Sequence, residues 1–148
     1  MRLALVTGVL LMVAAIGYTQ LPRGVRNNNP LNIRKGNDWQ GEAISFDGAF
    51  ESFINPIYGF RAAAVIVKGA YRNRGITTLS EVVTVWAPES DNNPTTHYID
   101  FVAEKTGLNA NSTVTDEVLA PVLHAMSIFE LGGDYFGMAM AQQGVNLA

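Results

Sequence analysis

The chain has 148 residues, of which 48% are hydrophobic and 16% charged, with a net charge of −3. That length fits one compact domain, and the lack of a basic excess argues against nucleic acid as a partner. The chain contains no cysteine, which excludes disulfides and a thiol nucleophile, and its only histidines are His97 and His124. We therefore expect neither a metal centre nor a cofactor.

The first element is an uncharged segment, Leu3–Leu21, with the sequence LALVTGVLLMVAAIGYTQL. As a helix it would be about 28 Å long, close to the roughly 30 Å hydrocarbon core of a bilayer. We predict a transmembrane helix, with residues 1–22 as a membrane anchor or signal anchor and residues 23–148 as the globular domain. A cleaved signal peptide and a buried core helix are the alternatives. Basic residues after the segment favour a cytoplasmic domain, or one inside a membrane-bearing particle.

Residues 26–55 then form a loop-rich insert, beginning RNNNPLNIRKGNDWQG. Asparagine, glycine and proline favour turns, so we expect loops and short strands here. Loops of this length are usually functional or disordered, and the aromatic residues of this insert argue against disorder.

Helices follow from residue 56 onward, so the fold class is predicted to be mainly α. Pro56 suits the first turn of one helix and Gly75 its end. Thr78 and Glu81 have the spacing of a capping box at the start of the next helix, which Pro88 ends.

Two more helices and a short last one complete the predicted domain. One begins at Thr95 or Thr96 and ends at Gly107. The other begins after Thr115 and ends at Gly132, with Pro121 bending it or splitting off its first turn. Residues 134–148 predict the short final helix.

Glu130 is the strongest candidate for a catalytic acid. It lies in the last turn of the predicted helix that carries Leu119, Leu123 and Met126 on an apolar face. Apolar surroundings and the negative end of a helix both raise the pKa of a carboxyl, so a proton would be held near neutral pH. The alternative is a solvated glutamate that happens to end a helix.

Other acids have plainer interpretations. Asp91 and Glu89 lie in the asparagine-rich stretch WAPESDNN, where Asp91 suits a cap or an Asx turn. Glu42 and Glu51 lie in the loop-rich insert, where we expect them to be solvated.

Amides and aromatic rings are the side chains that bind sugars, because rings stack on apolar C–H faces and amides bond to hydroxyl and N-acetyl groups. Turn formation is the alternative role for any single asparagine. We predict the following substrate-binding residues: Asn28, Asn29, Asn32, Trp39, Trp86, Asp91 and Tyr98.

Several short motifs occur in order between residues 23 and 148: Asn28-Asn29-Pro30, Asn32-Ile33-Arg34, Trp39-x-Gly41, Gly59-x-Arg61-Ala62 and Trp86-Ala87-Pro88. In combination they resemble a family of small phage virion and lysis proteins related to the lytic enzyme of an enveloped double-stranded RNA phage. The resemblance implies a lysozyme-like murein hydrolase that opens the bacterial cell wall.

The order of these motifs also resembles other wall-degrading enzymes. The run NN…NI…W.G is similar to that of bacterial wall glucosaminidases, where it follows the helix of the catalytic glutamate. Here the helix ending in Glu130 comes after this run instead, and it resembles the corresponding helix of lytic transglycosylases. This implies a circularly permuted lysozyme-like arrangement, with Glu130 against the Asn/Trp loop. Asp91 and Leu131 depart from the family pattern, which usually has Glu and a polar residue there.

We therefore predict a membrane-anchored, virion-associated peptidoglycan lytic transglycosylase or muramidase with Glu130 as general acid and base. Its predicted partners are peptidoglycan glycan strands, a lipid membrane through residues 3–21 and other virion proteins. The predicted location is the virion membrane or bacterial inner membrane, acting on the periplasmic cell wall. The alternatives are a murein endopeptidase, a non-catalytic virion membrane protein with a lysozyme fold, and a secreted endolysin.

Overall fold

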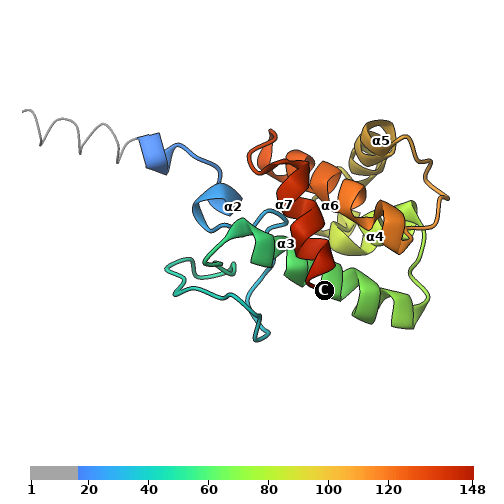
Figure 1. Ribbon diagram of the computed structural model, residues 1–148. Helices are drawn as coiled ribbons and strands as arrows, with labels where there is room; N and C mark the ends of the chain where they lie inside the picture. Colours follow the sequence, from blue (N-terminus) through green and yellow to red (C-terminus); the bar gives the residue numbers. More distant parts are fainter. Residues whose placement is uncertain (1–16) are drawn as a thin grey trace, which may run out of the picture.

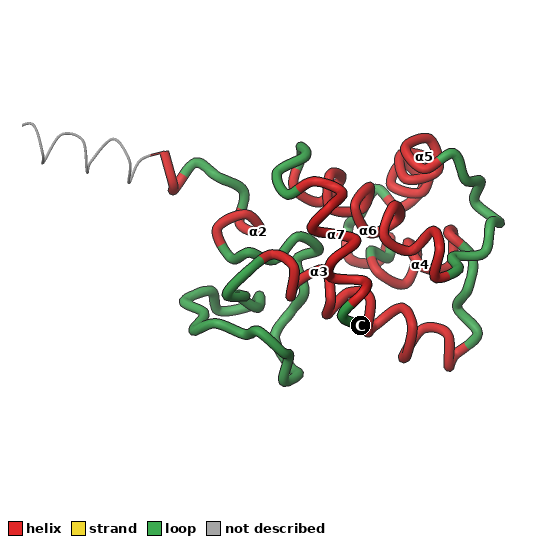
Figure 2. Tube along the Cα trace, viewed as in Figure 1, coloured by secondary structure: helices red, strands yellow, loops and turns green. Residues whose placement is uncertain are grey.

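The computed structural model describes residues 17–148, and this part of the chain is mainly helical (Figures 1 and 2). A short helix, α2 (Arg23–Arg26), is followed by a long loop segment. After that loop, α3 (Pro56–Val65) continues into a π-helical stretch, η1 (Ile66–Tyr71), and a 3-10 turn, η2 (Arg72–Arg74). The remaining helices are α4 (Leu79–Trp86), η3 (Glu89–Asp91), α5 (Thr95–Thr106), α6 (Asp116–Leu131) and α7 (Gly137–Asn146).

The predicted fold class requires a correction. We expected a lysozyme-like helical domain preceded by a transmembrane helix. Among the helices of residues 17–148, however, none combines the length and the apolar character needed to cross a bilayer. Most of the segment predicted to do so, residues 3–16, lies outside the described residues. The described fold is a helical domain with one loop-rich segment.

The helix boundaries follow local sequence signals closely. The Thr78 hydroxyl accepts a hydrogen bond from the Glu81 amide, and the Glu81 carboxylate accepts one from the Thr78 amide (2.9 Å), which confirms the predicted capping box. Gly75, Gly107 and Gly132 follow η2, α5 and α6 in the left-handed conformation, with φ between 72° and 75°. Glycine adopts this conformation without strain, so it ends helices at low cost.

Helix α5 begins at Thr95, one of the two predicted starts, but no threonine caps it. Pro94, rather than a threonine, occupies the N-cap of α5, and the Thr95 hydroxyl instead donates to the Ala87 carbonyl (2.6 Å). Thr95 thereby ties the start of α5 to the end of α4. Pro121 lies within a continuous α6, so of the two predicted alternatives the split-off first turn is wrong.

The core lies around α6, which packs against α5 on one side and α7 on the other, while α7 also packs along α3 (Figure 1). Gly144 of α7 allows this close contact, because a Cβ there would overlap Phe60 of α3. The fully buried side chains with the largest volumes include Phe60, Leu79, Val83, Tyr98, Val102, Leu119, Leu123 and Met126.

The loop-rich segment, residues 27–55, lies beside α2 and α3, on the side of the molecule away from α4 and α5 (Figure 2). Its only strand-like features are two isolated antiparallel bridges, Arg34–Phe50 and Glu42–Phe53. α2 connects this segment to the core by packing against α6. A Cβ at Gly24 would overlap the Leu131 side chain and the Asn29 carbonyl, so glycine is needed for this approach.

Candidate active site

The carboxyl of Glu130 is held by two segments that are distant in sequence. The Asn32 side-chain amide, from the loop-rich segment, donates to Oε2 at 3.1 Å. The Tyr98 hydroxyl, from α5, donates to Oε1 at 3.0 Å. The packing of α2 on α6 brings Asn32 to this point, across 98 residues of sequence.

The surroundings of Glu130 favour its protonated form. Burial raises the pKa of Glu130 above its ordinary value of 4.5, and the hydrogen bonds from Asn32 and Tyr98 offset only part of this rise. Tyr98 is 1% exposed and stacks on Phe129, with ring centroids 4.1 Å apart. Burial and the nearby Glu130 charge raise the pKa of Tyr98 well above 10.0, so its hydroxyl stays protonated and donates.

A hollow of about 210 Å³ opens at this carboxyl, and we call it the Glu130 pocket. Its walls come from the start of α2, the loop-rich segment and the end of α6: Pro22, Arg23, Gly24, Asn32, Phe50, Glu130 and Leu131. Leu131, which stands where the family pattern usually has a polar residue, is buried and faces Gly24. Glu130 is the one carboxylate among these lining residues.

A second hollow of about 220 Å³ shares the Asn32 wall, and we call it the tryptophan pocket. It is lined by Trp39 and Trp86, and by Ile66 and Tyr71 from the π-helical stretch. The Nε1–H group of Trp39 is buried and has no hydrogen-bond partner among residues 17–148. A buried donor without a partner costs about 1–3 kcal/mol of stability.

Two of the predicted substrate-binding asparagines hold the loop together. Asn29 is fully buried; its side-chain amide donates to the carbonyls of Ile33 (2.9 Å) and Glu51 (3.0 Å), and its side-chain oxygen accepts from the Ile33 amide (2.9 Å). The Asn28 side chain donates to the Phe53 carbonyl (3.0 Å). Both side chains therefore form hydrogen bonds that stabilise the loop-rich segment.

The remaining acids lie elsewhere. Asp91 is exposed in η3 and makes no hydrogen bond to Glu130. Glu51 was expected to be solvated but is only 7% exposed, because the loop folds over it. Burial, and then the neighbouring Glu42 charge, raise the pKa of Glu51. Its carboxylate lines a separate polar hollow with Glu42.

Sequence reasoning did not assign four residues that shape the site: Arg23, Phe50, Tyr71 and Phe129. Arg23 belongs to the basic residues that follow the uncharged segment, and it stands four positions before Asn27, where the run of asparagines begins. Phe129 stands next to Glu130 in the chain, which was an available signal. No local pattern marks Phe50 or Tyr71, because their roles arise from long-range packing.

The fold and site define a small helical protein with a partly buried carboxyl between polar and aromatic side chains. No group of three or more His, Asp or Glu side chains within residues 17–148 is arranged to hold a metal ion. No protein-family model matches the chain.

The chain is 39% identical to Protein P5 of Pseudoalteromonas phage PM2 over 137 residues, which cover 84% of this chain and 85% of that protein. At this identity and coverage, the chain belongs to the family of phage PM2 Protein P5.

Proposed function

We propose that this protein cleaves the glycan strands of bacterial peptidoglycan, with Glu130 as the general acid. The observation that carries the proposal is the partly buried Glu130 carboxyl, which has a raised pKa and lines a hollow that shares Asn32 with one lined by two tryptophans. A phage relative is consistent with a wall-degrading role during entry or release.

The proposed reaction begins with proton transfer from Glu130 to the glycosidic oxygen. Each carboxyl oxygen has two lone pairs, so the acidic proton can reside on Glu130 while Asn32 and Tyr98 still donate. As the bond to the leaving sugar breaks, the resulting Glu130 carboxylate is stabilised by these two donors. The tryptophans would stack on the sugar rings.

A transglycosylase route fits the site better than two-carboxylate hydrolysis. Hydrolysis requires a second carboxylate on the opposite side of the bond. Glu130 is the only carboxylate lining its pocket, and Asp91 and Glu42 are exposed. The 6-hydroxyl of the substrate sugar would attack the anomeric carbon and return its proton to Glu130, leaving a 1,6-anhydro end without consuming water.

Mass spectrometry of muropeptides released from purified sacculi tests this proposal. We expect 1,6-anhydro sugar ends from the wild type and none from Glu130→Gln. New reducing sugar ends would indicate hydrolysis, and new peptide ends alone would indicate an endopeptidase. Ser127, a residue such an enzyme could use, is buried and its hydroxyl donates to the His124 carbonyl (2.8 Å).

One observation favours a second candidate, a non-catalytic virion protein. Both oxygens of Glu130 accept hydrogen bonds from other segments, so this side chain also connects α6 to α5 and to the loop-rich segment. If that connection were its whole role, the folded wild type would release no fragments from sacculi, and replacing Glu130 would affect only stability.

A further inference from the structure

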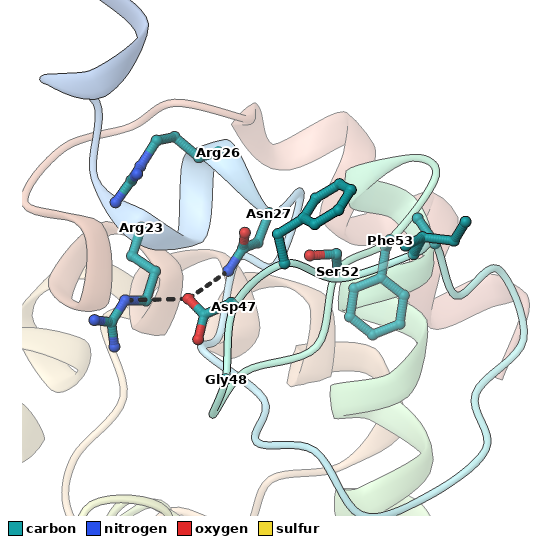
Figure 3. Close-up of a pocket in the computed structure, with 10 residues that line it drawn as sticks. Arg23, Arg26, Asn27, Asp47, Gly48, Ser52 and Phe53 are labelled. Atoms are coloured by element: carbon teal, nitrogen blue, oxygen red, sulfur yellow. Dashed lines mark hydrogen bonds and ion pairs between the residues drawn. The ribbon is translucent and has the colours of Figure 1, made fainter.

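A third hollow lies next to the Glu130 pocket, on the other side of Arg23. Its volume is about 520 Å³, and its walls include Arg23, Arg26, Asn27, Phe46, Asp47 and Ser52 (Figure 3). We call it the arginine pocket. Arg23 lines both hollows, just as Asn32 lines both the Glu130 pocket and the tryptophan pocket. The Glu130 pocket therefore shares one wall residue with each of the other two hollows.

The two arginines differ in how far their charge is neutralised. They are three residues apart in α2 and so lie on one face of it, and Figure 3 shows both side chains extending to the same side. Arg23 forms an ion pair with Asp47 (Nε to Oδ2, 3.2 Å) and lies over the Phe50 ring. The Arg26 side chain is exposed and has no acidic partner among residues 17–148.

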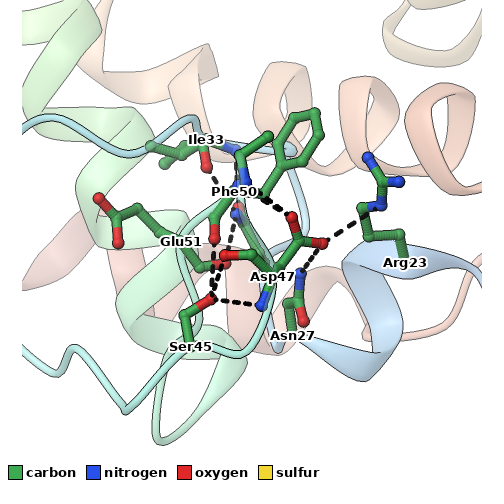
Figure 4. A network of polar contacts seen from close by, with 9 residues as sticks. Arg23, Asn27, Ile33, Ser45, Asp47, Phe50 and Glu51 are labelled. Atoms are coloured by element: carbon green, nitrogen blue, oxygen red, sulfur yellow. Dashed lines mark hydrogen bonds and ion pairs between the residues drawn. The ribbon is translucent and has the colours of Figure 1, made fainter.

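The opposite wall of the arginine pocket is a loop held in place by Asp47. Its carboxylate accepts hydrogen bonds from the Asn27 side chain and from the amides of Ala49 and Phe50 (Figure 4). These hydrogen bonds, above all the one from the Ala49 amide, lower the pKa of Asp47, so its carboxylate stays charged at neutral pH. In the loop that Asp47 holds in place, the Phe46 side chain is 99% exposed, and it lines the same pocket as the two arginines.

We propose that the arginine pocket binds the carboxylate-bearing stem peptide of the strand whose sugars occupy the other two hollows. This inference rests on the proposed function. Stem peptides extend from the sugars and carry free carboxylates, so a cationic hollow adjoining the cleavage site matches their position and charge. Arg26 supplies a guanidinium free to bind a carboxylate in bidentate fashion, and Phe46 supplies an apolar surface for the peptide side chains.

Binding of two matched substrates by the full chain tests the inference. Glu130→Gln is used as the parent, so that the strands are not cleaved. Soluble glycan strands carrying peptides are compared with the same strands stripped of peptide by an amidase. We expect Arg26→Ala to weaken binding of peptide-bearing strands about tenfold, and of stripped strands by less than about twofold. Arg26→Lys should restore part of the loss.

Arg74→Ala is the matched control, because Arg74 is an exposed arginine of η2 that lines none of the three hollows. It should bind both substrates like the parent. If Arg26→Ala binds both kinds of strand as tightly as the parent, or if its affinity for both falls by the same factor, the peptide subsite is overturned while the proposed function stands. If the parent binds neither strand, the proposed function itself fails.

Discussion

Asn29 and Asn32 stand three residues apart in the same loop, and each side-chain amide donates to a glutamate, yet the two contacts belong to different regions. Asn29 bonds the backbone carbonyl of Glu51 inside the loop-rich segment. Asn32 bonds the side chain of Glu130 on α6, at the floor of a hollow. The Asn29 side chain therefore stabilises the loop itself. The Asn32 side chain joins the loop to the helical core at Glu130, a group that can carry a proton.

The two glutamates extend this comparison. Burial raises the pKa of both Glu51 and Glu130. Around Glu51 the neighbours include the further acids Glu42 and Asp38, in a polar hollow. Among the residues that line the Glu130 pocket there is no second acid: the Glu130 carboxyl accepts from two neutral donors, Asn32 and Tyr98, and its pocket is lined by Arg23 and Phe50. A raised pKa alone therefore does not mark a catalytic acid, because both glutamates have one; what surrounds the carboxyl separates them.

The largest expected effect comes from exchanging each glutamate for its amide. Glu130→Gln should lower the rate of sacculus cleavage by about 100-fold or more, because general acid catalysis contributes roughly 10²–10⁴ in rate. Glu51→Gln should stay within about twofold of the wild type. Release of labelled fragments from sacculi measures both, with circular dichroism to check folding. Equal losses in the two variants would remove the distinction between the two acids.

Exchanging Asn29 should act on stability. Asn29→Ala removes three buried hydrogen bonds to backbone, so the free energy of unfolding should fall by about 2–4 kcal/mol. Asn37→Ala, at an exposed position of the same segment, should change it by less than about 0.5 kcal/mol. Urea titrations give both values. An Asn29→Ala chain as stable as the wild type would contradict the architectural role.

These two regions also show which features could be predicted from the sequence and which could not. The helices were predictable because their signals are local, as with the Thr78–Glu81 capping box and the glycines after η2, α5 and α6. The burial of Glu51 and the separate uses of Asn29 and Asn32 were not, since they depend on how the loop folds over itself and over α6. A local pattern cannot show which asparagine of a run will meet a residue 98 positions away.

A smaller effect should appear in the pH dependence of activity. Asn28 and Asn32 both have positive φ values, 49° and 51°, so glycine fits the backbone at each position. Asn32→Gly removes a donor that favours the charged form of Glu130, and the pKa of Glu130 should rise further. An acid that stays protonated to higher pH should move the alkaline limb of the kcat/KM profile upward.

Asn28→Gly provides the comparison, because it loses the hydrogen bond that the Asn28 side chain donates to the Phe53 carbonyl, and this bond does not involve Glu130. Its alkaline limb should coincide with that of the wild type. A downward shift for Asn32→Gly, or the same shift in both variants, would show that Asn32 does not tune the acid.

The most direct test of the whole account is a ¹³C NMR titration of the Glu130 side-chain carboxyl, assigned by its absence in Glu130→Gln. The account predicts a midpoint clearly above the ordinary value of 4.5, caused by burial. A midpoint at or below 4.5 would mean that Glu130 is ionised throughout the neutral range and has no proton to donate.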